Sequence, residues 1–234
     1  MNRQSQTAVL FLLGASLLHA GTTDLYLRYV KGGLRPLLLT AGAVLVAAAL
    51  ASVWYARKAG RPEDRHPGPR VSWLLVLPVL ALVLVAPPAL GSYSATRAGT
   101  ALQEPVAYPA LPSGDPLRLG VADYAGRAVY ADGRGLAGRR IEITGFLAVD
   151  GAGAPYLVRM ALSCCAADAQ PIKIALTGEV PPVLQPDTWL RVSGGYSPRV
   201  TKDPVNGGPI PSFEVTAATP VPVPHDPYDE DWNT

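Results

Sequence analysis

Long runs without a charged residue dominate the first 96 positions of this chain, and mixed polarity follows. The clearest run, Pro36–Tyr55, holds no charged residue. A bilayer core about 30 Å thick needs about 20 helical residues, because the backbone must satisfy its own hydrogen bonds there. This run therefore predicts a membrane span over residues 36–55. A second uncharged run, Val71–Thr96, predicts another span over about residues 72–94, which Pro87 and Pro88 end or kink.

The first apolar segment has two interpretations. It is either a retained span over about residues 7–29 or a secretory signal peptide cleaved near Ala20. The residues before Ala20 fit a small-x-small cleavage site poorly, and two spans follow directly, so we favour the retained span. His19 and Asp24 then lie in or near the membrane, where ionisable groups are costly and often functional. Alternatively, both lie at the interface and bond to headgroups and water.

Lysine and arginine residues in the short loops indicate the orientation. Six lie on one side of the predicted spans: Arg3, Arg57, Lys58, Arg61, Arg65 and Arg70. Three lie on the other: Arg28, Lys31 and Arg35. Since the side richer in these residues faces the cytoplasm, we expect a multi-pass protein of the cell membrane with a cytoplasmic N-terminus and an extracytoplasmic C-terminal domain.

A period of two replaces the long apolar runs in the second half of the chain. Five short segments alternate apolar and polar positions between Gly, Pro and Asp turns: Arg139–Val149, Tyr156–Leu162, Ile172–Leu176, Asp187–Gly194 and Ser212–Thr216. They predict an all-β domain, an OB-like five-stranded barrel. Gly145 and the pair Gly194-Gly195 are candidates for the kinks that a small barrel requires.

These patterns divide the chain into four parts. Residues 1–96 form the transmembrane region, and residues 97–115, with prolines and no sustained period, form a linker. Residues 116–219 form the extracytoplasmic domain, which starts with a short helix within 116–132. Residues 220–234 form a proline-rich, acidic tail.

Composition and motifs exclude several functions. The net charge of +2 is small and no basic stripe with interleaved aromatic residues occurs, so a nucleic-acid partner is not expected. The chain has no Walker loop, Gly-x-Ser-x-Gly, His-Glu-x-x-His or Cys-x-x-Cys motif, so we do not expect an enzyme.

The only two cysteines, Cys164 and Cys165, are adjacent, and Asp168 follows three positions later. Thiolates favour soft ions such as zinc(II) and copper(I), so these three residues are the predicted metal ligands. Neighbouring residues of a regular strand point to opposite faces, so a shared ion requires a turn or bulge here. A tetrahedral zinc site needs a fourth ligand, which His225, water or a partner chain would supply.

Other interpretations of this stretch remain open. Outside the cytoplasm two thiols tend toward oxidation, and the pair would then be a redox centre. Their disulfide would be strained, because one peptide holds the Cα atoms only about 3.8 Å apart. Alternatively, the cysteines are small buried hydrophobes. Asp168 and Gln170 would then cap a turn and lead into a strand, although Gln170 also remains a functional candidate. We expect Arg159 and Lys173 to be solvated charges on strand faces.

The motif stretch from Arg159 to Pro171, with its Cys-Cys-Ala-Ala-Asp-Ala-Gln-Pro sequence, resembles the YcgQ family of bacterial membrane proteins. Gly138–Phe146, Pro227-Tyr228-Asp229 and His19-Ala20-Gly21 add to the resemblance, which covers nearly the whole chain. It implies a subunit of a predicted two-component permease, encoded beside a multi-span permease of the YcgR type and linked to metal homeostasis.

Residues and resemblance together predict an accessory subunit of a membrane permease, whose outer domain binds or hands over zinc or copper through Cys164, Cys165 and Asp168. The expected partners are the permease and the lipid bilayer. The alternatives are a vicinal-dithiol redox protein and a structural module that contacts the permease.

Overall fold

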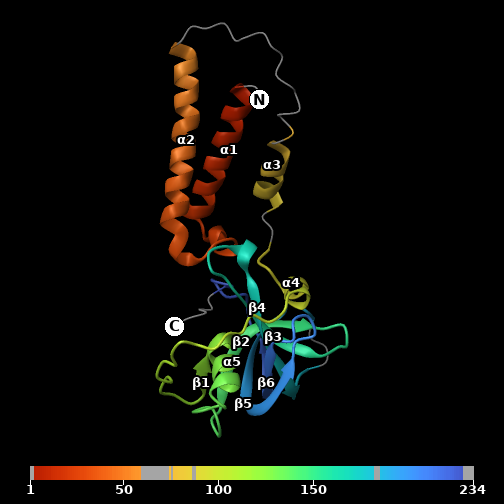
Figure 1. The fold of residues 1–234 in the computed structure, drawn as a ribbon. Helices are drawn as coiled ribbons and strands as arrows, with labels where there is room; N and C mark the ends of the chain where they lie inside the picture. Colours follow the sequence, from red (N-terminus) through yellow and green to blue (C-terminus); the bar gives the residue numbers. More distant parts are fainter. Residues whose placement is uncertain (1–2, 59–73, 75, 86–87, 182–184, 229–234) are drawn as a thin grey trace. The chain divides into compact units, whose positions relative to one another are not determined.

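The computed structural model describes residues 3–58, 74, 76–85, 88–181 and 185–228. The chain forms two compact units, Met1–Pro88 and Ala89–Thr234. The first unit is helical and the second is built around a β-sheet (Figure 1). The boundary follows Pro88, whose ring removes a backbone donor and disfavours continuation of a helix.

Two helices, α1 (Arg3–Thr22) and α2 (Arg35–Lys58), lie side by side in the first unit (Figure 1). Glycines mark their closest approach. A Cβ added to Gly14 would lie 2.9 Å from the carbonyl oxygen of Gly42, and a Cβ added to Gly42 would lie 3.0 Å from that of Gly14. The lack of side chains at both positions lets the two backbones come close, as in many membrane helix pairs.

Two short 3-10 helices, η1 (Asp24–Arg28) and η2 (Gly32–Leu34), connect α1 to α2. Tyr26 and Leu27 are buried in this connection. The Arg35 Nε donates a hydrogen bond of 2.9 Å to the carbonyl oxygen of Gly21, and its guanidinium lies 5.7 Å from the centre of the Tyr26 ring. These contacts hold the start of α2 against the end of α1.

Three transmembrane helices are not confirmed. Within the described residues one helix, Gly32–Lys58, is long and apolar enough to cross a membrane. Only 11% of its most apolar window is buried, whereas the core helix of a soluble domain would be mostly covered. Its length and its place near the N-terminus fit either a membrane span or a signal sequence.

The helix α1 ends earlier than the predicted span over residues 7–29. The hydroxyl groups of Thr22 and Thr23 donate hydrogen bonds to the carbonyl oxygens of Leu18 and His19, one turn back, and η1 follows. The helix also begins with polar residues (Arg-Gln-Ser-Gln-Thr), so its apolar part is shorter than a bilayer core requires.

The predicted span over residues 72–94 is not one continuous helix. Its described helix, α3 (Val76–Val85), has 10 residues, which correspond to about 15 Å. Residues 88–91 are not helical, and the next helix, α4 (Ser92–Arg97), belongs to the second unit. Residues 72–73, 75 and 86–87 of that prediction lie outside the described residues.

The second unit contains a closed five-stranded β-barrel, as predicted. Its strands pair in the order β2–β3–β4–β6–β5, and β5 pairs again with β2. The β4–β6 pair is parallel and the other barrel pairs are antiparallel. The strands are β2 (Ile141–Val149), β3 (Pro155–Ala161), β4 (Gln170–Gly178), β5 (Trp189–Lys202) and β6 (Pro209–Pro220).

The alternation of apolar and polar positions predicted where the strands lie, but three of them, β4, β5 and β6, extend beyond the predicted segments. The last two strands, β5 and β6, form a hairpin with bulges at Ser193/Gly194 and Ser197/Val200. At Gly194 an added Cβ would collide with the carbonyl oxygen of Glu214, so only glycine fits this bulge. The expectation of a kink at Gly194 is therefore confirmed.

The apolar positions form two clusters. The larger one fills the barrel and includes Ile141, Leu157, Ile174, Leu190 and Phe213 among its members. A short strand, β1 (Leu117–Leu119), pairs in parallel with β2, and the helix α5 (Val121–Tyr130) contacts all five barrel strands. The smaller cluster includes Phe146, Val158, Met160, Leu162, Trp189 and Tyr228.

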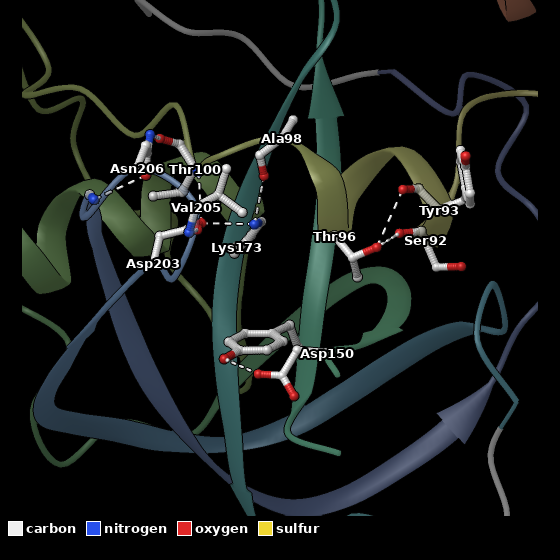
Figure 2. A network of polar contacts seen from close by, with 12 residues as sticks. Ser92, Tyr93, Thr96, Ala98, Thr100, Asp150, Lys173, Asp203, Val205 and Asn206 are labelled. Carbon is white, nitrogen blue, oxygen red and sulfur yellow. Dashed lines mark hydrogen bonds and ion pairs between the residues drawn. The ribbon is translucent and has the colours of Figure 1, made fainter. Parts of the chain in front are cut away.

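The prediction that Lys173 and Arg159 are solvated is wrong, because both are only 5% exposed. Figure 2 shows how the positive charge of the buried Lys173 is compensated. Its ammonium donates to the Asp203 carboxylate at 2.7 Å and to the carbonyl oxygen of Ala98 at 2.8 Å. Asp203 also accepts from the N–H groups of Thr100 and Val205, both at 2.8 Å. Burying a charge is expensive unless it is paired and hydrogen-bonded, and this network meets both conditions.

Segments on either side of the predicted domain pack against the barrel unit. Within residues 97–115, Thr100 and Leu102 are buried, and the Ala101 N–H bonds to the carbonyl oxygen of Pro171. Within residues 220–234, Tyr228 is buried, and its hydroxyl accepts a hydrogen bond of 2.7 Å from the Leu90 N–H. Both segments thus contribute contacts to the unit.

Candidate metal-binding site

The two cysteines lie in the loop between β3 and β4, outside both strands. The first strand ends at Ala161 and the second begins at Gln170, and a 3-10 turn, η4 (Ala166–Asp168), lies between them. Cys164 is exposed and Cys165 is half-buried, and both are free thiols. They are therefore not part of either hydrophobic cluster, which excludes the interpretation of a buried cysteine pair.

Asp168 organises the loop by accepting backbone hydrogen bonds. Its Oδ1 accepts from the Ser163 N–H at 2.8 Å, and its Oδ2 accepts from the N–H groups of Cys164 at 2.8 Å and Cys165 at 3.2 Å. In return the Asp168 N–H donates to the Cys165 side chain, which completes a capping box for η4. The carboxylate thus bends the chain around itself at the two cysteines.

This geometry brings the predicted ligand atoms together. The two Sγ atoms and a carboxylate oxygen of Asp168 all lie within 4.8 Å of one another. An unbroken strand would send adjacent side chains to opposite faces, so the turn at residues 162–169 makes the convergence possible. Within the part of the chain that the structure describes, this is the one group of three or more His, Cys, Asp or Glu side chains placed to hold an ion.

The charge of Asp168 controls protonation in the loop. A hydrogen bond with the Asp168 carboxylate, and a second one with the Cys165 side chain, raise the pKa of the Cys164 thiol to about 12. Partial burial raises the pKa of Asp168, but the hydrogen bonds from the Cys164 thiol and the three N–H groups outweigh it and lower that pKa to about 2. At neutral pH the ion-free loop therefore holds a protonated Cys164 beside an ionised carboxylate.

The ends of the loop are fixed on the barrel. Leu162 is 1% exposed and belongs to the smaller cluster, and Ala169 packs against the same cluster. Beyond the loop, Lys173 is tied to Asp203, and the Pro171 carbonyl oxygen accepts from Ala101. The thiols thus project from a short turn between two anchored strands, which limits how far the ligand atoms can separate.

The remaining predicted site residues lie outside this group. Gln170 is exposed at the first position of β4, and His225 is exposed in the C-terminal segment. His19 is exposed near the end of α1, and Asp24 is exposed at the start of η1. None of these four is among the residues that the structure brings together with the cysteines.

Sequence reasoning missed two polar assemblies in the second unit. One is the Lys173–Asp203 network, and the other is a group of arginines, Arg118, Arg159 and Arg191, that line one cavity. The members of each assembly are far apart in sequence. No spacing of residues in the sequence identifies these assemblies. The one available signal is a charged residue between apolar positions of a predicted strand, as at Lys173.

Comparison with known proteins identifies a domain within the second unit. No curated protein and no solved structure matches the chain. One family model matches residues 123–229, a range that includes the five barrel strands and the cysteine loop. The chain therefore carries a DUF1980 C-terminal domain at residues 123–229, which is consistent with the YcgQ-like resemblance of its sequence.

Proposed function

We propose that the barrel domain binds a soft metal ion, zinc or copper, through Cys164, Cys165 and Asp168. The observation that carries the proposal is the convergence of two sulfur atoms and a carboxylate within 4.8 Å on an exposed loop. Thiolates select zinc and copper(I) among the common biological ions. The donors fit such an ion, and bound metal would keep both thiols deprotonated.

The ligand set suggests transfer of the ion rather than permanent storage. Structural zinc sites are closed by four protein ligands, and this loop offers three. An exchangeable ligand, such as water or a side chain of a partner, would complete the shell. The Asp168 carboxylate already accepts hydrogen bonds from three backbone N–H groups. Fewer of its lone pairs are then available to a metal ion, which weakens the carboxylate as a ligand and favours release of the ion.

The helical unit supports a location at the cell membrane. The helix α2 exposes Leu37, Val44 and Leu50, and near its end the Trp54 ring contacts both the Tyr55 ring and the Lys58 ammonium. Aromatic and basic side chains at a helix end are typical of a membrane interface. We propose that this unit anchors the protein in the cell membrane through α2 and contacts a permease of the YcgR type, with the barrel outside the cytoplasm. The strand order and the parallel β4–β6 pair support an OB-like architecture for the barrel.

Metal content tests the proposal directly. Full-length protein, purified reduced and brought to equilibrium by dialysis against a fixed concentration of zinc(II) or, without oxygen, copper(I), is expected to bind about one ion per chain, because the described residues hold one such group of ligands. The Cys164→Ser/Cys165→Ser variant should retain none. Since both side chains lie outside the hydrophobic clusters, this variant should unfold at the same temperature as the original protein. Equal metal content in both proteins would remove the proposal.

Metal affinity should rise with pH. The pKa of Cys164 is raised to about 12, so an ion must displace its proton at neutral pH. Binding therefore releases protons, and the affinity should increase about tenfold per pH unit for each proton released. Zinc titrations at pH 6, 7 and 8, in two buffers of different ionisation enthalpy, measure both quantities. An affinity that stays constant over this range would contradict the assignment of Cys164 as a ligand.

A vicinal-dithiol redox protein is the second candidate, because both thiols are accessible. The raised pKa of Cys164 disfavours this residue as the attacking group, since the thiolate is the nucleophile in disulfide exchange and little Cys164 thiolate would be present at neutral pH. Thiol labelling in cells, before and after reductant, separates the two candidates. A pair whose labelling never changes counts against redox chemistry, and a pair that cycles supports it.

A further inference from the structure

The helix α4 presents an aromatic and a cationic side chain on its exposed face. Tyr93 is 69% exposed, and the guanidinium of Arg97, also exposed, lies 4.4 Å from the centre of the Tyr93 ring. The two positions are one helical turn apart, so they are neighbours on the helix surface. An exposed tyrosine beside a cation is a combination that is enriched where a protein meets the interface of a membrane.

The opposite face of α4 is fixed on the barrel unit. Ser92 and Ala95 are buried, and Ala95 belongs to the smaller hydrophobic cluster. The Ser92 N–H donates a hydrogen bond of 2.5 Å to the Asp187 carboxylate, which holds the start of the helix. Tyr93 and Arg97 therefore project from a defined place on the barrel unit.

The turn that joins β5 and β6 extends this surface. Asp203 accepts from the Thr100 N–H, and the Asn206 amide donates a hydrogen bond of 2.9 Å to the Thr100 carbonyl oxygen, so the turn lies beside the segment that leaves α4 (Figure 2). Val205 in this turn is 50% exposed, and Lys202 just before it is exposed. Asp203, the one acidic residue of the turn, is buried, so the exposed side chains of α4 and the turn carry positive charge.

The sequence before α4 points to the partner of this surface. Arg97 is the first charged residue after Arg70. Within that run, the described helix α3 consists of apolar residues and exposes Leu84 and Val85. An apolar run that ends in an aromatic residue and then a cation follows the order of layers from the hydrocarbon core to the headgroups of a bilayer.

We propose that α4 and the β5–β6 turn dock the barrel unit on the anionic headgroup surface of the bilayer. Tyr93 and Val205 enter the interface, and Arg97 and Lys202 contact lipid phosphates. A chain advances at most about 3.6 Å per residue, so α4 stays close to the surface that the preceding apolar run enters. This inference rests on the membrane location proposed above.

Docking through α4 also positions the cysteine loop. Ala95 of α4 and Leu162, at the start of the loop, belong to the same hydrophobic cluster, and Ala169, at its end, packs against that cluster. A barrel held at the headgroups by α4 therefore keeps the thiols close to the bilayer. A membrane-embedded partner could then reach the metal ion without release of the barrel.

Quenching by spin-labelled lipids tests the docking. The full-length double serine variant described above has no cysteine, so Ser94→Cys places a single polarity-sensitive fluorophore on α4. The protein is reconstituted into vesicles of phosphatidylcholine and phosphatidylglycerol with spin-labelled headgroups. Val106→Cys is the control position, because Val106 is 92% exposed and follows Pro105, which packs on Gly126 of α5. The label at position 94 should be quenched, and the label at position 106 should not.

The charge of Arg97 should control this docking. In the labelled Ser94→Cys protein, Arg97→Gln should lower the ratio of docked to undocked protein about fivefold, the effect of one basic side chain at an anionic surface. Arg134→Gln is the matched control, since Arg134 is also exposed but lies in the turn after α5. Vesicles of phosphatidylcholine alone, and high salt, should weaken docking as well.

Flotation with the vesicles separates this inference from the membrane location itself. A protein that does not float removes both. A protein that floats, but whose label at position 94 is quenched no more than the label at position 106, overturns the docking alone. Blue-shifted emission without quenching by lipid would show that a protein surface covers α4, which also overturns it. An equal effect of Arg97→Gln and Arg134→Gln would contradict the assigned surface.

Discussion

Replacing Lys173 by methionine is expected to lower the free energy of unfolding of the barrel unit by about 3–5 kcal/mol, the usual cost of breaking a buried ion pair. The substitution leaves the Asp203 carboxylate, whose side chain is fully buried, without its counter-charge. Burial by itself raises the pKa of Asp203, but hydrogen bonds from Lys173 and from the N–H groups of Val205 and Thr100 lower it below its ordinary value. Without Lys173 the carboxylate must stay charged at a high cost or take up a proton.

Denaturant unfolding of the full-length protein, followed by the β-sheet circular dichroism signal, measures this loss. Lys202→Met is the matched control, because Lys202 is exposed at the end of β5 and its replacement should change stability by less than about 0.5 kcal/mol. In the double variant Lys173→Met/Asp203→Asn, the asparagine oxygen can still accept a backbone N–H. This variant should be more stable than the sum of the two single losses predicts. A Lys173→Met protein as stable as Lys202→Met would show that the pair contributes nothing.

Replacing Asp168 by asparagine is expected to remove most metal binding although both cysteines remain. Three N–H groups and the Cys164 thiol bond to this carboxylate, and an amide has only one acceptor oxygen. The loop would lose the bonds that bring the two sulfur atoms to one side. We expect at least a 10–100-fold loss of metal affinity, as for groups that orient metal ligands.

Asp150→Asn is the matched control for the Asp168 variant. Asp150 also organises a turn: it accepts from the N–H groups of Ala152 and Ala154 and from the Tyr156 hydroxyl, but no thiol lies in that turn. Both substitutions weaken a turn of the barrel, and only Asp168→Asn should change the metal affinity. An equal loss in the two variants would indicate that general destabilisation, rather than the geometry of the thiols, lowers the affinity.

Local patterns of apolar and polar residues predicted much of the fold because they show which positions of the chain are buried. Alternation along Arg139–Val149 and Tyr156–Leu162 located β2 and β3, since one face of a barrel strand is always covered. The uncharged run Pro36–Tyr55 located α2 for a similar reason, because a helix of that length and composition is rarely stable when it is surrounded by water. The Cys-Cys-x-x-Asp spacing identified the candidate ligands, because the carboxylate can reach the backbone N–H groups a few residues before it.

Where the predictions failed, the deciding contacts are ones that the pattern of apolar and polar positions does not show. The extent of α1 depends on hydroxyl groups that bond back to the helix and on its packing against α2, and an apolar run does not encode either. Lys173 was expected in solvent because a charge within a strand usually faces water. Its counter-charge is 30 residues away, in the turn that joins β5 and β6, and no local period connects the two.

The sequence by itself determined a helical N-terminal part, a five-stranded β domain and a cluster of two thiols and a carboxylate, because periodicity and near-neighbour bonding are local properties. Only the tertiary structure decided that the thiols converge on an exposed turn, that Lys173 is buried against Asp203, and that three arginines share one cavity. The thiols depend on hydrogen bonds that Asp168 accepts within the loop, whereas Lys173 and Asp203 are 30 positions apart and meet only because the strands assemble into a barrel.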